Sequence, residues 1–217
     1  MINSNLFKYP RTPHLPCSPG TTSDDKKLSE GQLEAYYCGV ETIYTEKMDG
    51  ENTTMYSDYI HARSLDSRHH PSRDWVKRYH SELAHEIPPF WRICGENLFA
   101  KHSISYDNLD SYFYGFSIWD ENNVCLNWRE TQLWFDVLGI KCVPVIEDAP
   151  PITCLSAVEA LGQKIVNQGK EGFVARRAGD FEYHRFEKSV VKYVRANHVQ
   201  TTEHWAHTEI IPNKLRG

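Results

Sequence analysis

The sequence predicts an α+β fold in which largely antiparallel sheets are flanked by helices. Segments rich in β-branched and aromatic residues, which favour strands, are mixed with helical segments without strict alternation. Three segments show apolar residues recurring at intervals of three and four, which is typical of helices. With 217 residues, of which 40% are hydrophobic, the chain is long enough for one large core. We therefore expect residues 1–217 to form a single domain.

The first sixty residues divide into an arm and a pair of strands. Residues 8–31 are dense in Pro, Gly, Ser and Thr, which favour irregular structure. The segments 35–47 and 52–60 are rich in Tyr, Thr, Val and Ile, and the turn signal Asp49-Gly50 lies between them. The sequence predicts that these two strands pair antiparallel.

The helices are expected over residues 74–87, 127–138 and 156–169. Asp74 is a candidate N-cap, while Asn127 with Glu130 and Ser156 with Glu159 have capping-box spacing. Further strands are expected over residues 90–101, 111–120, 140–147, 171–177 and 188–196.

Composition excludes several classes of protein. A net charge of −5 argues against a wholly basic nucleic-acid-binding surface, although it permits a local basic groove. No apolar run approaches the roughly 18 residues of a membrane span, and the first residues lack the apolar core of a signal peptide, so we expect a cytoplasmic protein without a membrane partner. The six cysteines are scattered singly, which favours reduced thiols over a zinc site.

The segment YTEKMDGENTTMY, residues 44–56, places Lys47 at the end of a predicted strand. A lysine amine with a pKa of about 10.4 becomes a nucleophile when its surroundings remove the proton. A strand end facing a cleft provides such surroundings. Taken alone, however, a short KxDG pattern is more often a solvent-facing lysine in a hairpin.

Other polar residues are candidates for binding a nucleotide. Arg63 lies in a loop with Arg68, Arg73, His69 and His70, and guanidinium groups bind phosphate in bidentate fashion. Glu96 and Glu171 lie in strand-like segments, where a carboxylate accepts ribose hydroxyls or holds Mg²⁺.

Three residues near two later strands complete this set. Phe116 is suited to stacking on a base, and Lys192 and Arg195 are suited to phosphate contacts. Each signal has an ordinary alternative, namely a solvated loop, an exposed strand edge or, for Phe116, a core side chain.

The order of these motifs is more specific than any one of them. It resembles the motif series of the covalent nucleotidyltransferases, which include ATP-dependent RNA ligases, DNA ligases and mRNA capping enzymes. The likeness is greatest to the bacterial and phage RNA ligases, also through YPRTPHL, AKHS and KYVRANHVQTTEHW, and it extends from Tyr9 to Trp205. The motifs are EKMDGEN (46–52), ARS (62–64), GEN (95–97), YGFSIWD (114–120), EGFVAR (171–176) and VVKYVR (190–195).

The resemblance implies a nucleotidyltransferase domain of the ATP-grasp-like ligase kind and assigns roles to the first motif. Lys47 matches the lysine that attacks the α-phosphate of ATP to form a lysyl-AMP phosphoramidate. Asp49 and Gly50 complete the motif, with the glycine letting the backbone approach the nucleotide. Glu46 and Asn52 match neighbours that help to hold the adenosine.

The later motifs receive roles in the same way. Arg63 matches an arginine near the phosphates and ribose, and Glu96 matches the ribose-binding acid. Phe116 matches the aromatic side chain that stacks on adenine, and Glu171 matches the acid linked to the metal or its waters. Lys192 matches a lysine of the last motif, which the resemblance counts among the catalytic residues with Lys47 and Asp49.

The sequence departs from the family pattern in two places. The family often has two lysines separated by one residue, and the first would fall at Val190, so Lys188 or Arg195 is expected to substitute or one phosphate contact is missing. About twenty residues follow Val194, too few for the OB-fold that many relatives append, which predicts a minimal nucleotidyltransferase domain.

The resemblance implies an ATP-dependent RNA ligase that uses Mg²⁺ or Mn²⁺ and joins 5′-phosphate and 3′-hydroxyl RNA ends. RNA is the expected partner, and a separate kinase, phosphatase or RNA-binding protein is left open. Two alternatives remain: another nucleotidyltransferase, such as a DNA ligase or a capping-type enzyme, or a nucleotide- or RNA-binding module with weak or no catalysis.

Overall fold

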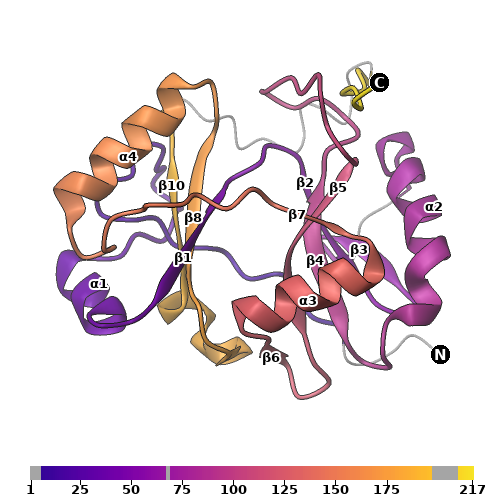
Figure 1. Ribbon diagram of the computed structural model, residues 1–217, viewed down its shortest axis with the longest axis horizontal. Helices are drawn as coiled ribbons and strands as arrows, with labels where there is room; N and C mark the ends of the chain where they lie inside the picture. The colour runs from indigo at the N-terminus through magenta and orange to yellow at the C-terminus, as the bar shows by residue number, and fades with distance from the viewer. Residues whose placement is uncertain (1–5, 67–68, 197–209) are drawn as a thin grey trace.

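The computed structural model describes residues 6–66, 69–196 and 210–217 (Figure 1). Over these residues the α-helices are α1 (Glu30–Tyr37), α2 (Asp74–Leu83), α3 (Trp128–Leu138) and α4 (Leu155–Asn167). The 3₁₀ helices are η1 (Pro71–Arg73), η2 (Ala84–Glu86) and η3 (Tyr183–Lys188). The strands are β1 (Thr42–Glu46), β2 (Glu51–Met55), β3 (Ile60–Ala62), β4 (Arg92–Asn97), β5 (Phe113–Trp119), β6 (Val124–Cys125), β7 (Lys141–Cys142), β8 (Gly172–Arg177), β9 (Phe181–Glu182) and β10 (Val190–Val194).

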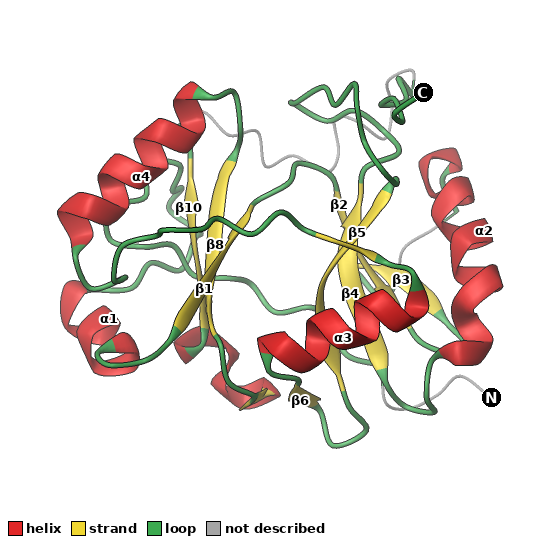
Figure 2. Cartoon of the chain, viewed as in Figure 1, coloured by secondary structure: helices red, strands yellow, loops and turns green. Residues whose placement is uncertain are grey.

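The strands form two sheets (Figure 2). The smaller sheet has the order β1-β8-β10 and is antiparallel throughout. The larger sheet has the order β3-β2-β4-β5-β6-β9, also antiparallel, with β7 added to β5 in parallel. Antiparallel sheets flanked by helices confirm the predicted α+β class.

Apolar clusters hold the helices and the two sheets together. Helices α1 and α4 cover one face of the smaller sheet, where Tyr37, Val158 and Tyr193 are buried (Figure 1). Helices α2 and α3 share a core with β2, β4 and β5. A further cluster joins the sheets to each other, because it brings Val190 of β10 against Trp119 of β5. Another cluster also joins the sheets, since it includes Ile43 of β1 and Tyr114 of β5, and it reaches the crossing between them through Met48.

The predicted pairing across Asp49-Gly50 is wrong, and this correction decides where the site lies. β1 pairs with β8, with Glu46 opposite Phe173, whereas β2 pairs with β3 and β4. Residues 47–50 are therefore a crossing from one sheet to the other. The chain bends at Gly50 but makes no hairpin turn there, because local turn chemistry does not specify which strand becomes the partner.

The strand prediction is also wrong at residues 35–37, which belong to helix α1. Ser29 and Gln32 form a reciprocal capping box that starts this helix at Glu30. Tyr37 packs into the core from the helix, so its aromatic character reflects burial rather than strand structure. The preceding arm is irregular as predicted, apart from isolated bridges such as that between His14 and Lys192.

The three predicted helices are confirmed, with differences at their starts. α3 has the expected cap, because Asn127 Oδ1 accepts the Glu130 N–H at 2.9 Å, and it ends at Gly139 with a φ of 66°. α2 has Arg73 rather than Asp74 at its N-cap position. α4 has Cys154 at its N-cap position, without a capping hydrogen bond from the side chain, so the predicted Ser156 box is wrong and Ser156 lies inside the helix.

Each segment predicted as a strand contains one in the structure, but the strand within residues 140–147 is much shorter than predicted. It is reduced to Lys141–Cys142, because the chain then leaves β5 and contacts β1, where the Glu46 N–H donates to the Pro144 carbonyl. Among the described residues, none of the helices has the length and apolarity needed to cross a membrane.

Candidate active site

Lys47 lies one residue beyond β1, at the crossing between the sheets. Its N–H donates to the Gly172 carbonyl at 3.0 Å, which fixes the backbone against β8. The next side chain, Met48, is buried in the apolar cluster with Leu98 and Tyr114. The lysine is therefore not the solvent-facing residue of a hairpin turn.

Three carboxylates surround the Lys47 amine. Its Nζ donates to Glu171 Oε2 at 2.7 Å, and Glu171, which directly precedes β8, has no exposed surface. Burial by itself lowers the pKa of Lys47, but the negative charges of Glu171, Glu96 and Asp49 outweigh it and raise that pKa. The amine is thus held protonated while the acids around it are charged.

Glu96 lies near the end of β4 and faces the same crossing. Its Oε1 accepts the Gly50 N–H at 3.2 Å. Burial raises the pKa of Glu96 to about 8, and although Lys47 opposes this shift, Glu171 and Asp49 add to it.

The raised pKa predicts that the stability of the nucleotide-free protein falls as the pH rises from about 4.5 to about 8. In that window the folded state keeps the Glu96 proton that the unfolded state has released. We expect Glu96→Gln, which cannot ionise, to be more stable than wild type by about 1–3 kcal/mol at pH 8 and nearly equal at pH 5. Urea unfolding at both pH values measures the free energies of unfolding, with the exposed Glu82→Gln as control. An equal fall in stability from pH 5 to pH 8 in wild type and in Glu96→Gln would contradict the prediction.

Asp49 is held by a loop, residues 98–112, that follows β4. Its Oδ2 accepts three hydrogen bonds: from the Ser103 N–H at 2.8 Å, from the Ser103 hydroxyl at 2.6 Å and from the Ile104 N–H at 2.8 Å. The Asp49 N–H in turn donates to the Tyr106 hydroxyl at 2.9 Å. Sequence reasoning missed these partners; the AKHS segment, which includes Ser103, was the only signal for them.

Close packing requires a glycine at position 50, which the sequence did not reveal. A Cβ at this position would lie 2.4 Å from the Asn97 carbonyl oxygen and 2.8 Å from a Leu98 methyl group. The crossing therefore passes too close to the end of β4 for any side chain, whether or not a nucleotide is present.

Cationic side chains border the acids. Lys192 on β10 has its pKa lowered to about 8 by burial, and the charge of Lys47 adds to this effect, as does that of Arg63. Arg63 itself is exposed. Arg195 donates its N–H to the Glu171 carbonyl and its Nη2 to Ser103 Oγ, both at 3.0 Å. Among the described residues, no hydrogen-bond partner meets its buried Nε.

Lys188 lies apart from this group. It is exposed in η3, with Nζ 5.5 Å from the centre of the Tyr36 ring, and it precedes β10 at the end opposite Arg195. Val190 is 3% exposed and packs in the apolar cluster with Trp119 and Phe186. Of the two proposed substitutes for the second lysine, the fold therefore brings only Arg195 to the acids.

The three residues expected to hold the adenosine lie in different surroundings. Asn52 on β2 is opposite Glu96 on β4, and its Oδ1 is buried without a hydrogen-bond partner among the described residues. Phe116 on β5 is half-buried, with its ring 5.1 Å from that of Tyr9. Glu46 is buried and pairs with Lys170 at 2.5 Å.

The cationic loop predicted around Arg63 is not a uniform phosphate site. Arg73 forms a two-point ion pair with the buried Glu51, with Nε 2.7 Å from Oε2. His69 is exposed and His70 caps η1 through its Nδ1. Arg68 lies outside the described residues.

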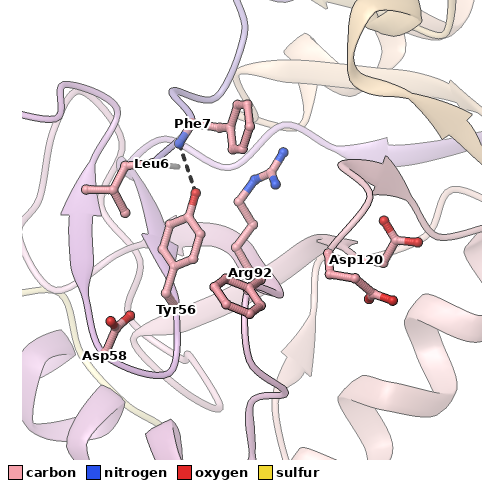
Figure 3. Close-up of a pocket in the computed structure, with 8 residues that line it drawn as sticks. Leu6, Phe7, Tyr56, Asp58, Arg92 and Asp120 are labelled. Atoms are coloured by element: carbon pink, nitrogen blue, oxygen red, sulfur yellow. Dashed lines mark hydrogen bonds between the residues drawn. The ribbon is translucent and has the colours of Figure 1, made fainter. Parts of the chain in front are cut away.

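A separate pocket lies at the other end of the larger sheet (Figure 3). It is formed around Tyr56, after β2, and Arg92, which begins β4. The Arg92 guanidinium packs 4.9 Å from the centre of the Phe7 ring and 4.7 Å from that of Trp119, and the Phe7 N–H donates to the Tyr56 hydroxyl. These contacts hold Phe7, which directly precedes the arm, against the larger sheet, and the pocket is distinct from the Lys47 site.

With this geometry established, comparison with known proteins identifies the family. The family model for RNA ligases matches residues 40–194, which include all the motifs from EKMDGEN to VVKYVR except Arg195, the final residue of the last motif. The chain belongs to the RNA ligase family. No curated protein matches its sequence.

Solved structures share the fold of this RNA ligase family member. An archaeal ATP-dependent RNA ligase superposes with a TM-score of 0.61 at 19% identity over 87% of this chain and 48% of its own. A variant of the Naegleria gruberi RNA ligase with ATP and manganese superposes with a TM-score of 0.58 at 20% identity, over 89% of this chain and 60% of its own. A putative ATP-dependent DNA ligase from Aquifex aeolicus superposes with a TM-score of 0.53 at 17% identity, over 87% of this chain and 50% of its own. The chain thus spans about half to three fifths of these structures.

The side chains of this RNA ligase family member suit a nucleotide and a hard divalent cation. Mg²⁺ takes oxygen ligands and keeps several waters, so it needs only one or two carboxylates besides the phosphates. Among the described residues no group of three or more His, Cys, Asp or Glu has the geometry of an all-protein metal site. Glu171, with Glu96 nearby, could supply these carboxylates, and Asn52 Oδ1 and Arg195 Nε are a buried acceptor and a buried donor that lack a hydrogen-bond partner among the described residues.

Proposed function

We propose that this protein is an ATP-dependent RNA ligase that joins 5′-phosphate and 3′-hydroxyl RNA ends through a lysyl-AMP intermediate. The observation that supports it best is the position of the Lys47 amine, which lies 2.7 Å from the buried Glu171 at the crossing between two sheets. Family membership over residues 40–194 adds the class of reaction.

In the first step, the Lys47 nitrogen attacks the α-phosphorus of ATP. An N–P bond forms, the bond to the bridging oxygen of the β-phosphate breaks, and pyrophosphate leaves. The amine must first lose a proton, and Glu171 Oε2, which already accepts its hydrogen bond, is the nearest acceptor. Bound Mg²⁺ or Mn²⁺ would supply positive charge to the phosphates and offset the carboxylates that raise the Lys47 pKa.

The cationic residues support the transfer by binding the phosphates. Lys192 and Arg195 lie beside the acids, and the charge of Arg63 acts on Lys192; phosphoryl transfer depends chiefly on positioning and on stabilising charge. Asn52 and Glu96, side by side on neighbouring strands, would bind the nucleoside, and Phe116 remains the candidate for stacking on adenine.

Two further transfers would complete ligation. An oxygen of the RNA 5′-phosphate attacks the AMP phosphorus, the N–P bond breaks and Lys47 is regenerated. The 3′-hydroxyl of the second end then attacks the 5′-phosphate, and AMP leaves with the pyrophosphate oxygen. The RNA ends would therefore have to reach Lys47, and RNA binding should weaken with salt.

Labelling with radioactive ATP tests the first step. Protein stripped with pyrophosphate and incubated with α-labelled ATP and Mg²⁺ should give a labelled band on a denaturing gel, and α-labelled GTP should not. Absence of the band from folded protein would leave a nucleotide- or RNA-binding module. Label from GTP would instead indicate a capping-type enzyme.

Sealing assays then identify the nucleic acid. We expect nicked duplexes with a 5′-phosphate to be joined when the ends are RNA. The DNA ligase alternative, suggested by the likeness to the Aquifex aeolicus protein, requires equal or faster sealing of all-DNA nicks.

A further inference from the structure

Segment 210–217 lies against the loop that holds Asp49. In Figure 1 this last part of the chain lies beside the loops above β2 and β5. Backbone hydrogen bonds join them, among them Lys101 N–H to the Ile211 carbonyl at 2.8 Å and Leu109 N–H to the Lys214 carbonyl at 3.0 Å. Arg216 adds an ion pair with Asp110 at 3.1 Å.

Asn213 is the centre of this contact. It is only 3% exposed, which is unusual for asparagine unless its polar groups are paired. Its Nδ2 donates to the Leu98 carbonyl at 2.7 Å, and its Oδ1 accepts the Tyr106 N–H at 2.9 Å. Its N–H donates to the Phe99 carbonyl, and its carbonyl accepts the Tyr112 hydroxyl, both at 2.9 Å.

The same loop contacts the lysine motif on its other side. Tyr106, whose N–H is held by Asn213, accepts the Asp49 N–H through its hydroxyl at 2.9 Å. Ser103 and Ile104 donate three hydrogen bonds to the Asp49 carboxylate. Two hydrogen bonds, one to the Tyr106 backbone and one to its hydroxyl, therefore connect Asn213 through Tyr106 to the backbone two residues beyond Lys47.

We propose that Asn213 is a positioning residue, which fixes loop 98–112 and, through Tyr106, sets the backbone of Asp49 and hence the aim of the Lys47 amine. This inference rests on the proposed function for its catalytic consequence. Attack on phosphorus requires alignment of the amine with the bond that breaks, and small displacements of a reacting group cost large factors in rate.

The kinetic test uses Asn213→Ala and Tyr106→Phe in the full chain. Each should lower the single-turnover rate of lysyl-AMP formation by about 10- to 100-fold, with the ATP concentration for half-maximal rate changed less than about 2-fold. The double variant should be little worse than either single one, because both break the same path. Lys214→Ala, which changes an exposed neighbour of Asn213, is the matched control and should keep the wild-type rate.

Amide hydrogen exchange gives a second reading that does not depend on activity. In Asn213→Ala, exchange should become faster at residues 48–50 and 103–106 but not in β8 and β10. Folded Asn213→Ala with wild-type rate and exchange would overturn the inference, as would a loss confined to ATP affinity. If Asn213→Ala fails to fold, Tyr106→Phe, which removes one hydroxyl, decides in its place. If wild type forms no lysyl-AMP, the proposed function fails, while the exchange result still decides whether Asn213 controls the Asp49 loop.

Discussion

Lys47→Arg is expected to form no detectable lysyl-AMP, a loss of at least about a thousand-fold. Arginine preserves the positive charge and reaches Glu171, so the ion pair and the fold should be retained. Its guanidinium stays protonated at any pH at which the protein is folded and has no nucleophilic lone pair. Labelling with α-labelled ATP on a denaturing gel measures the loss.

A matched control and a bypass make this prediction specific. Lys170→Arg changes another lysine that pairs with a glutamate, Glu46, and should still be labelled strongly. RNA that already carries a 5′-adenylate should be sealed by Lys47→Arg, because the last transfer does not use the amine. Labelled Lys47→Arg protein would place the nucleophile at a different residue.

The second large effect is expected from Glu171→Gln, which should slow lysyl-AMP formation by about 100-fold or more. Glutamine keeps the size of the side chain and an oxygen that can accept from Lys47, but it removes the negative charge. Two effects oppose each other: the Lys47 pKa falls, which favours the neutral amine, whereas the proposed proton acceptor of Lys47 and the proposed charged ligand of a divalent cation are both lost. We expect the loss of the metal ligand to dominate. The triphosphate carries more charge than the amine, so neutralising it with a divalent cation matters more than the protonation of Lys47.

Metal dependence separates these two consequences. The Mg²⁺ concentration for half-maximal single-turnover rate should rise at least about tenfold in Glu171→Gln, while the exposed Glu159→Gln should match wild type. Thermal unfolding of both variants controls for the burial of Glu171. A slow Glu171→Gln variant with unchanged Mg²⁺ dependence would assign the metal to other ligands and leave Glu171 as a partner of Lys47 alone.

Local signals in the sequence were reliable where neighbours in the chain determine the structure. The start of α3 was predictable because Asn127 and Glu130 cap it themselves, and its end because Gly139 adopts a positive φ. Where distant packing decided, the same kind of signal failed: Ser156 resembles a cap, yet α4 begins earlier, at Leu155. The aromatic residues before β1 suggested a strand, although Tyr37 is buried from a helix.

By itself, the sequence identified Lys47 and the acids Asp49, Glu96 and Glu171 as candidates for one site, because ordered motifs specify residue types and spacing. Only the tertiary structure decided how they meet. Lys47 and Glu171, 124 residues apart, come within 2.7 Å because β1 pairs with β8 instead of with β2. The hydrogen bond from the Tyr106 N–H to the Asn213 side chain was equally invisible, since a contact between distant parts of the chain leaves no periodic pattern in the sequence. Strand partners and such contacts depend on the packing of the whole chain, which no local segment encodes.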